Sequence, residues 1–262
     1  MQASVDASTP EPRTGTQTVE RALAILNLFR DGPDSLSITE IARQTGLHVS
    51  TAHRIVRALC AEQFMDQDAR SERYLLGPSL AILGRRALDS SGLGVAQPIL
   101  ERLADTTGES VSLGVRRGSE LVVVLSSSSH QRLRFDHEPG SVILLHASAM
   151  GKVLLAFGDV AAKSAVADLP ELVRYTDATI TARTALVADL EQAHRKGFAL
   201  NREERYDGVC GVAAPVFDRR DVAIAAVGLQ GPTIRLTPKR LAELASEVRA
   251  AASDVAAAMR AR

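Results

Sequence analysis

The sequence predicts an α/β (α+β) protein with two folded domains: a winged helix-turn-helix at the N-terminus and a following domain of mixed helices and strands. Two observations predict this class. Before about residue 91, apolar residues recur at spacings of three and four, as in amphipathic helices, and a single short hairpin is indicated. After residue 92, stretches of strand character alternate with further helices. A chain of 262 residues is long enough for two cores.

Changes in composition and periodicity divide the chain into four segments. The first is polar and contains two prolines, so we expect a disordered tail. The Ser90-Ser91-Gly92 run is the best hinge candidate. The expected segments are the tail over 1–16, the winged helix-turn-helix over 17–77, a linker helix over 78–91 and the second domain over 92–262.

The first domain is expected to hold three helices and a hairpin. Its second helix starts at a capping box, in which Ser37 caps free backbone N–H groups and Glu40 reaches back to the backbone of Ser37. That helix ends at Thr45-Gly46, and the turn there joins it to the third helix. The expected helices span about 19–29, 38–45 and 49–63, and the hairpin strands about 64–66 and 73–76.

The second domain is expected to combine one sheet with several helices. Gly108 ends its first helix, and Arg116–Ser119 forms the turn of its first hairpin. The expected helices span about 95–107, 148–157, 159–168, 184–196 and 238–260, and the strands about 111–115, 121–126, 133–137, 142–145, 198–201, 212–217 and 222–229.

The charge balance at first argues against a nucleic-acid partner. The chain has 31 basic and 31 acidic side chains, so its net charge is zero with His neutral. Residues 1–80 even contain 8 basic against 10 acidic side chains. However, the stretch from Arg43 to Arg57 holds three arginines, two histidines and no acid. The first domain therefore has a local basic region that the balance of the whole chain conceals.

The composition disfavours several other classes of protein. The longest apolar run, Val222–Leu229, is too short for a membrane span, and the start of the chain is unlike a signal peptide. Cys60 and Cys210 form neither a disulfide framework nor a zinc pattern. We therefore expect a cytoplasmic protein that uses no membrane, metal or cofactor.

The third helix of the first domain is the expected DNA-reading element. In a helix-turn-helix, residues in the first turns of this helix reach base edges in the major groove. Ser and Thr hydrogen-bond to phosphate or base, and Arg forks onto guanine or holds phosphate. Two arginines alone would indicate only a solvated face, and His53 has the alternative of packing inside the domain. The expected DNA-binding residues are Thr39, Arg43, Ser50, Thr51, His53, Arg54 and Arg57.

These residues resemble the IclR-type family of bacterial transcriptional regulators. One departure is His48, which stands where the family often has a small capping residue for the recognition helix. The resemblance extends through the second domain and so covers nearly all of the chain after the tail. The stretches that carry it are Thr16–Phe29, Leu36–Gly46, Ser50–Leu59, Tyr74–Gly77, Leu145–Ala156, Gly197–Gly208, Ala213–Val216 and Gly231–Thr237.

The resemblance implies a GAF-like second domain that binds a small effector and supports homodimers or homotetramers. It also implies a near-palindromic operator in double-stranded DNA, since paired half-sites match two-fold protein symmetry. Effector binding would change the arrangement of the second domains and, through the linker helix, that of the DNA-reading helices. Repression and activation both remain open.

The resemblance further places an effector pocket in the second domain. Independently, the segment His146–Gly151 passes from an apolar strand into a helix, whose free N–H groups attract an anion such as a carboxylate, and Gly151 permits close backbone approach. The alternative is a packing role for Gly151 and a surface charge at Lys152. The expected effector-binding residues are Arg132, Phe135, Ile143, Ala149, Met150, Gly151, Asn201, Val209, Cys210, Gly211, Gly228 and Gln230.

Several pocket positions depart from family members that bind small keto acids. Gly211 and Gly228 stand where those members have Cys and Ser, which removes side-chain volume and hydrogen-bonding groups, while Phe135 adds a flat apolar surface. The change predicts a bulkier, more apolar carboxylate, such as an aromatic acid, and hence regulation of aromatic acid catabolism. Arg132 would pair with the carboxylate, unless it is a surface arginine. Glu203–Arg205 would either form a solvated loop or help to close the pocket.

Two functions from other classes were compared with this interpretation. An enzyme would use Cys210 as nucleophile with His146 or His194 as base, but nothing in the spacing sets such a pair, and buried free cysteines are common. We therefore expect no enzymatic activity. The stronger alternative is a DNA-binding regulator or architectural protein with no small-molecule effector.

Overall fold

The computed structural model describes residues 14–30 and 32–261 of the chain. They form two compact units, which divide between Ala87 and Leu88. Each unit has its own apolar core. The division therefore agrees with the two cores that the length of the chain permits.

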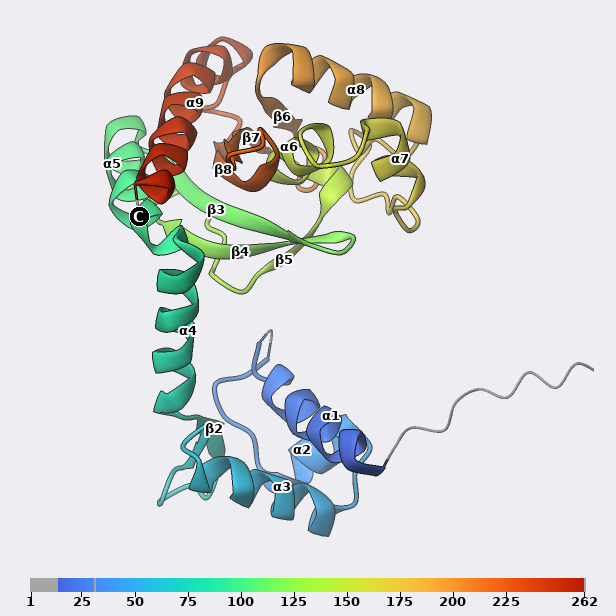
Figure 1. Cartoon of the computed structure of the whole chain (residues 1–262), viewed down its shortest axis with the longest axis vertical. Coiled ribbons are helices and arrows are strands. Elements are labelled where there is room, and N and C mark those ends of the chain that lie inside the picture. Colours follow the sequence, from blue (N-terminus) through green and yellow to red (C-terminus); the bar gives the residue numbers. More distant parts are fainter. Residues whose placement is uncertain (1–13, 31, 262) are drawn as a thin grey trace, which may run out of the picture. The chain divides into compact units, whose positions relative to one another are not determined.

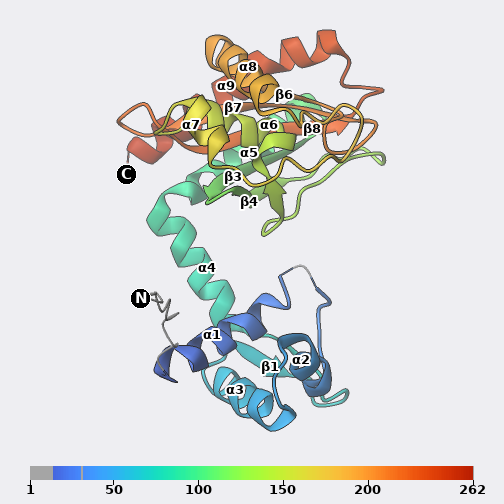
Figure 2. The same cartoon turned by 90° about the vertical axis from the view of Figure 1, so that its right-hand side faces the viewer.

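The first unit is a winged helix-turn-helix (Figures 1 and 2). Its helices share a core that includes Ile25, Ile41 and Val56, and two antiparallel strands form the wing directly after the third helix. A bridge between Leu36 and Tyr74 ties the wing to the segment before the second helix. The elements are α1 (Thr14–Asn27), α2 (Ile38–Thr45), α3 (Val49–Ala61), β1 (Met65–Gln67) and β2 (Tyr74–Leu76).

The ends of α2 are fixed by local contacts that the sequence predicts. The Ser37 hydroxyl oxygen accepts a hydrogen bond from the Glu40 N–H at 3.3 Å, and the Ser37 N–H donates to the Glu40 carboxylate at 2.7 Å. Gly46 ends the helix with a φ of 67°, which glycine adopts without strain. His48, by contrast, precedes α3 and makes no side-chain capping bond. The departure at His48 therefore leaves the start of α3 without a side-chain cap.

Helix α4 (Pro78–Ser91) spans the same residues as the expected linker helix and contains the division between the two units. It ends at Gly92, whose φ of 74° lies in the left-handed region. A residue with a side chain would be strained there, so the glycine suits the position.

The second unit is built around a six-stranded antiparallel sheet in the order β5-β4-β3-β8-β7-β6. Helices α5 and α9 cover one face and α6, α7 and α8 the other (Figure 1). The strands are β3 (Ser110–Arg117), β4 (Glu120–Ser127), β5 (Val142–Leu144), β6 (Ala199–Arg202), β7 (Val209–Phe217) and β8 (Ala223–Pro232). The helices are α5 (Gln97–Thr107), α6 (Ala149–Ala156), α7 (Ala162–Ala167), α8 (Arg183–Lys196) and α9 (Pro238–Arg260).

The two faces of the central strands carry side chains of different size. On β7 and β8, Val212, Val227 and Leu229 pack into the core under α5 and α9, whereas Ala213 and Ala226 belong to the core under α6 and α8. This alternation follows from the two-residue period of a strand. Small residues therefore line the face toward α6, which leaves room for a cavity on that side.

The structure corrects two expected elements. Residues 133–137 are irregular rather than a strand, because side-chain bonds, among them one from Arg235 to the Leu133 carbonyl oxygen, hold this segment in place of a ladder of backbone bonds. Helix α1 begins at Thr14, so the end of the expected tail is helical, while residues 1–13 lie outside the described residues. A helix can begin with polar residues, which the spacing of apolar residues does not detect. The apolar spacing therefore placed the start of α1 too late in the chain.

Candidate functional site

Helix α3 presents most of the expected DNA-reading residues on one exposed face, whereas Thr39 and Arg43 lie on α2. The opposite side of the helix is apolar and buried, which fixes the orientation of this face. His53 is exposed, so the alternative that it packs inside the domain is wrong. The predicted residues with exposed side chains are Thr39, Arg43, Ser50, His53, Arg54 and Arg57, and Thr51 is half-buried.

The three arginines predicted to bind DNA, Arg43 on α2 and two on α3, are not neutralised by neighbouring acids. Within residues 14–30 and 32–261, Arg43, Arg54 and Arg57 take part in no ion pair. Their guanidinium groups therefore keep their donors for phosphates or base edges.

The second unit contains a small cavity between α6 and the face of β7 and β8 that carries small residues. Its volume is about 20 Å³, which is room for about one water molecule. Asn201 of β6 and two irregular segments, one before β5 and one before β7, complete its wall. The predicted effector residues that line it are Phe135, Ala149, Met150, Asn201, Val209, Gly211, Gly228 and Gln230.

Four predicted effector residues are absent from the lining: Gly151, which packs against Leu145, and three residues that lie elsewhere in the second unit. Arg132 is exposed on the segment between β4 and β5 and is absent from the lining. This position agrees with the alternative that it is a surface arginine. Cys210 faces the core under α5 and α9, because it lies on the strand face opposite to Gly211. Ile143 is buried in the core on the α6 side. Their positions in the sequence alone do not distinguish these side chains from nearby residues that line the cavity.

The glycines of the site lie against protein atoms rather than open space. A Cβ at Gly151 would come within 2.3 Å of the Leu145 carbonyl oxygen, so the close backbone approach there is made by the protein itself. A Cβ at Gly228 would lie 2.4 Å from Met150 Cγ. One at Gly211 would lie 2.8 Å from a carbonyl oxygen of β8. The volume expected from the glycine positions is therefore already filled, in part by Met150.

The structure also brings polar and aromatic residues into the lining that were not predicted as ligands. Ser148 caps α6 and accepts the Gly151 N–H at 3.0 Å, so that N–H is not free for an anion. His137 and Tyr206 enter from the two irregular segments, as does Arg205. For Arg205, the signal in the sequence was its place in the Glu203–Arg205 run.

Arg205 and Gln230, which both line the cavity, carry buried donors without partners. Arg205 Nε and Nη1 and Gln230 Nε2 are buried and have no hydrogen-bond partner among the described residues. The guanidinium carbon lies 5.1 Å from the ring centroid of Tyr175 and 5.3 Å from that of Tyr206, so aromatic rings approach its faces. A buried donor without a partner costs about 1–3 kcal/mol, and more when it is charged. An anion in the cavity would satisfy these donors.

His137 stays neutral beside these donors. Burial lowers the pKa of its imidazole from 6.5 to about 4, the positive charge of Arg205 lowers it as well, and Asp136 acts in the opposite direction. The ring packs edge-on against Phe135, with the centroids 5.3 Å apart. At neutral pH, His137 therefore adds an imidazole but no charge to the cavity.

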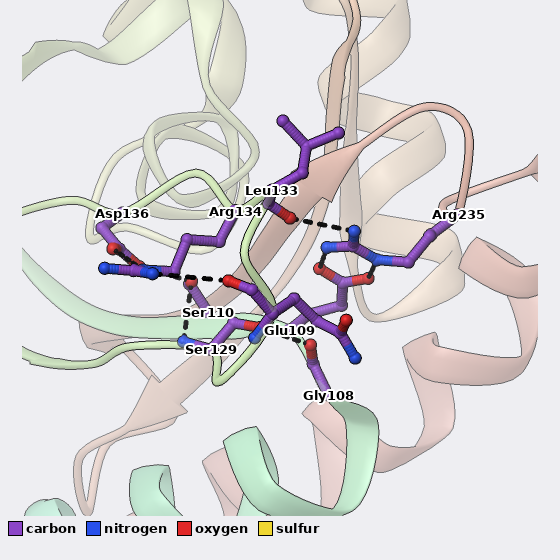
Figure 3. Close-up of polar contacts among 9 residues, drawn as sticks. Gly108, Glu109, Ser110, Ser129, Leu133, Arg134, Asp136 and Arg235 are labelled. Atoms are coloured by element: carbon purple, nitrogen blue, oxygen red, sulfur yellow. Dashed lines mark hydrogen bonds and ion pairs between the residues drawn. The ribbon is translucent and has the colours of Figure 1, made fainter.

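Polar contacts from distant parts of the chain hold the segment that carries the aromatic wall (Figure 3). Arg235 donates to both carboxylate oxygens of Glu109, at 2.6 and 2.7 Å, and to the Leu133 carbonyl oxygen at 2.9 Å. Ser110 Oγ donates to the Asp136 carboxylate at 2.5 Å. These side-chain bonds replace the ladder bonds of the expected strand and set the position of the wall.

Cys210 is not paired with a base. Burial raises the pKa of its thiol. His146 Nε2 lies 2.9 Å from the Val173 carbonyl oxygen, and the ring of His194 stacks on Phe157 at 4.9 Å between centroids. Within the part of the chain that the structure describes, no group of His, Cys, Asp and Glu could hold a metal ion. This arrangement supplies no activated thiolate.

The first unit defines the class of the protein as a winged helix-turn-helix DNA-binding protein, joined to a second unit with a polar-lined cavity. Comparison with protein families identifies both units. Residues 18–69 match the IclR helix-turn-helix domain, and residues 87–257 match the family described as bacterial transcriptional regulator IclR C-terminal. The chain belongs to the IclR family of bacterial transcriptional regulators.

Similar curated proteins are transcriptional regulators. The HTH-type transcriptional regulator BhcR of Paracoccus denitrificans is 34% identical over 95% of this chain and 89% of its own length. The glycerol operon regulatory protein of Streptomyces griseus is 37% identical over 93% of this chain and 94% of its own. These relatives confirm the expectation of a regulator rather than an enzyme.

Solved structures confirm the predicted α+β fold. An IclR transcriptional regulator from Alicyclobacillus acidocaldarius has a TM-score of 0.83 at 26% identity, over 93% of this chain and 98% of its own. An IclR homologue from Microbacterium hydrocarbonoxydans has a TM-score of 0.81 over 94% of this chain and 100% of its own. At 23% identity, the second likeness shows the fold alone.

None of the helices in the described part of the chain combines the length and the apolar character of a membrane span.

Proposed function

We propose that the protein binds a near-palindromic operator through α3 as a cytoplasmic dimer or tetramer, and that a small carboxylate in the cavity modulates this binding. Aromatic acids are the proposed class of effector. The observation that carries the proposal is the set of buried, unpartnered donors of Arg205 and Gln230, which both line the cavity. DNA binding is assigned to residues 17–77, the link to 78–91, and effector binding and assembly to 92–262.

The chemistry of the lining favours a carboxylate with an apolar body. A carboxylate accepts two parallel bonds from a guanidinium group, and such charge-assisted bonds are stronger than neutral ones. Phe135 and Tyr206, whose ring centroids are 4.9 Å apart, provide flat apolar surface beside Arg205. Arg205 thus takes the role first considered for Arg132, which lies outside the cavity.

Binding of an aromatic acid requires the cavity to open. A volume of about 20 Å³ holds little more than one water molecule. Met150 is a flexible side chain that fills the space above Gly228, and Tyr206 is exposed at the other side of the cavity. Movement of these side chains would admit the ring. An effector that binds the open form more tightly than the closed form shifts the equilibrium between them.

A solved structure of the same fold supports the proposed ligand class. The IclR homologue from Microbacterium hydrocarbonoxydans is complexed with 4-hydroxybenzoate in its crystal structure. That ligand is a property of that protein. For this chain, the aromatic class is supported by its own Arg205, Phe135 and Tyr206, which lie together at the cavity.

Titration calorimetry tests the choice of effector. Benzoate and 4-hydroxybenzoate are compared with glyoxylate and pyruvate, and melting temperatures are recorded with each acid, since a ligand of the folded state must raise them. Tighter binding of the benzoates supports the proposal, and tighter binding of the keto acids overturns the aromatic class. If no acid binds, the alternative of a regulator without an effector is favoured.

Footprinting of DNA upstream of neighbouring genes tests the operator. The footprint is expected to cover two half-sites about 34 Å apart, or a multiple of this, and to change on addition of the acid that binds. A footprint on random DNA of equal strength would contradict sequence-specific binding.

A further inference from the structure

Lys152 is a fully buried charge behind the cavity. The sequence allowed a surface position for it, but its side chain on α6 is only 1% exposed. Its Nζ lies 2.8 Å from an oxygen of Asp189 on α8 and 2.8 Å from an oxygen of Glu204 on the segment between β6 and β7. Neither carboxylate lines the cavity. These carboxylates therefore have no role that depends on direct contact with an effector.

An ion pair this deep is not explained by stability alone. Removing charges from water costs several kcal/mol per ion, and apolar residues of similar volume often serve a core equally well or better. Buried pairs are therefore poor evidence for stability. What they do provide is a strict requirement on geometry, because either charge without its partner is strongly unfavourable.

Glu204 connects this ion pair to the backbone segment between β6 and β7, which contributes Arg205 to the cavity lining. Its side chain is 5% exposed, and its Oε1 accepts both Lys152 Nζ and the Arg202 N–H, the latter at 3.3 Å. Its own N–H donates to Asn201 Oδ1 at 2.9 Å, and its carbonyl oxygen accepts the Thr179 hydroxyl at 2.7 Å. One carboxylate oxygen, the N–H and the carbonyl oxygen of Glu204 are thus held, while Oε2 is buried without a hydrogen-bond partner among the described residues.

Arg205 follows directly and depends on this anchor. Its Nε and Nη1 have no hydrogen-bond partner within the described ranges of the chain, so aromatic contacts and its own backbone set its position. Asp189 also pairs with Lys152, but it lies on α8 and, among the described residues, makes no hydrogen bond to the segment that carries Arg205. A change at Glu204 would reach Arg205 through the backbone, whereas a change at Asp189 would not.

We infer that the buried Lys152–Glu204 ion pair is a positioning device that sets the Arg205 guanidinium toward the cavity and thereby makes the site selective for anions. The inference rests on the proposed function, since it names how that site chooses a carboxylate. Lys152 and Glu204 are positioning residues that do not touch the ligand.

The test compares Glu204→Gln with Asp189→Asn in the full-length protein. Both variants remove one negative charge beside Lys152, and both keep the shape of the side chain. The readout is the ratio of the affinities for benzoate and for benzamide, which has the same ring without the charge. Glu204→Gln is expected to lower this preference for the anion about tenfold, the loss of one charge-assisted bond. Asp189→Asn should keep the wild-type preference.

A second comparison uses Arg205→Met. In that background the preference for benzoate is already lost, and Glu204→Gln is expected to lower it no further. If Glu204→Gln fails to fold, the Lys152→Met/Glu204→Gln double variant replaces it, because removing both charges of a buried pair is often tolerated. The double variant should fold and still lack the preference.

The outcomes separate the inference from the proposed function. Equal losses of preference in Glu204→Gln and Asp189→Asn, or a further loss in the Arg205→Met background, would overturn the positioning role while leaving effector binding intact. A wild-type protein that binds neither benzoate nor any other acid would instead overturn the proposed function, and this inference with it.

Discussion

The exposed face of α3 and the cavity beside α6 are the two proposed functional regions, and they are built in opposite ways. The α3 residues lie between Ser50 and Arg57 within one helix, and all but the half-buried Thr51 are exposed to solvent. The cavity residues range from Phe135 to Gln230 and are brought together by α6, three strands and two irregular segments. Because the α3 side chains take no part in the core, DNA binding should be separable from stability there. Around the cavity, by contrast, effector binding and stability should change together.

The largest expected effect is a loss of stability at Lys152. Lys152→Met leaves Glu204 and Asp189 buried or half-buried without their cation, which is expected to lower the free energy of unfolding by about 3–5 kcal/mol. Urea-induced unfolding followed by circular dichroism measures the change. Arg54→Ala, on the exposed face of α3, is the control and should stay within about 0.5 kcal/mol of the wild type. A loss below about 1 kcal/mol for Lys152→Met would contradict the coupling of site and core.

Arg54→Ala should instead weaken DNA binding. If Arg54 reads a base, the variant loses about 1–3 kcal/mol in binding of the operator, with little change on random DNA. If Arg54 contacts only phosphate, the affinity falls equally for operator DNA and for random DNA. Fluorescence anisotropy at a fixed salt concentration distinguishes the two results. Near-zero losses on both DNAs would refute the assignment of α3 as the recognition helix.

The pH dependence of stability should include a contribution from His137. Its pKa in the folded protein, about 4, lies below the ordinary 6.5, so between these values the unfolded chain binds more protons. Stability therefore falls as the pH falls through this range. For a half-buried ring this contribution amounts to about 1–2 kcal/mol after allowance for solvent screening.

Urea unfolding at a series of pH values measures this contribution. His137→Gln should flatten the dependence, whereas the same change at His130, whose side chain is 90% exposed, is the control. An unchanged slope in His137→Gln would show that the imidazole is protonated as readily in the folded as in the unfolded chain.

The smallest expected effects concern the helix caps of the first unit. Ser37→Ala removes the capping bond at the start of α2 and should cost about 1 kcal/mol. His48→Ser would supply the cap that α3 lacks, and a gain of a few tenths to about 1 kcal/mol is expected. Thermal unfolding measures both. Changes of the same sign in the two variants would show that these caps do not govern local stability.

Much of the first unit could be predicted because its signals are local. The capping box at Ser37 and Glu40, the glycine at the end of α2 and the missing cap at His48 each depend on residues a few positions apart. The helix period also identified which face of α3 is exposed. The apolar period failed only where polar residues belong to a helix, as at Thr14.

The second unit was predictable in its elements but not in its side-chain directions. Arg132 and Arg205 are both arginines near the pocket in sequence, yet only Arg205 lines the cavity. The expected strand over 133–137 failed because a bond from Arg235, about a hundred residues away, holds that segment instead. Such contacts depend on chain closure between distant residues, and no local pattern reports them.

The sequence by itself determined the fold class, the family, the order of the elements and the face of α3, because periodicity, caps and family motifs act over short distances. Only the tertiary structure decided that Lys152 is buried rather than on the surface, that Met150 fills the space above Gly228, and that Arg205 lines the cavity and carries unpartnered donors. The physical reason is that burial, packing and the pairing of charges depend on which distant residues meet.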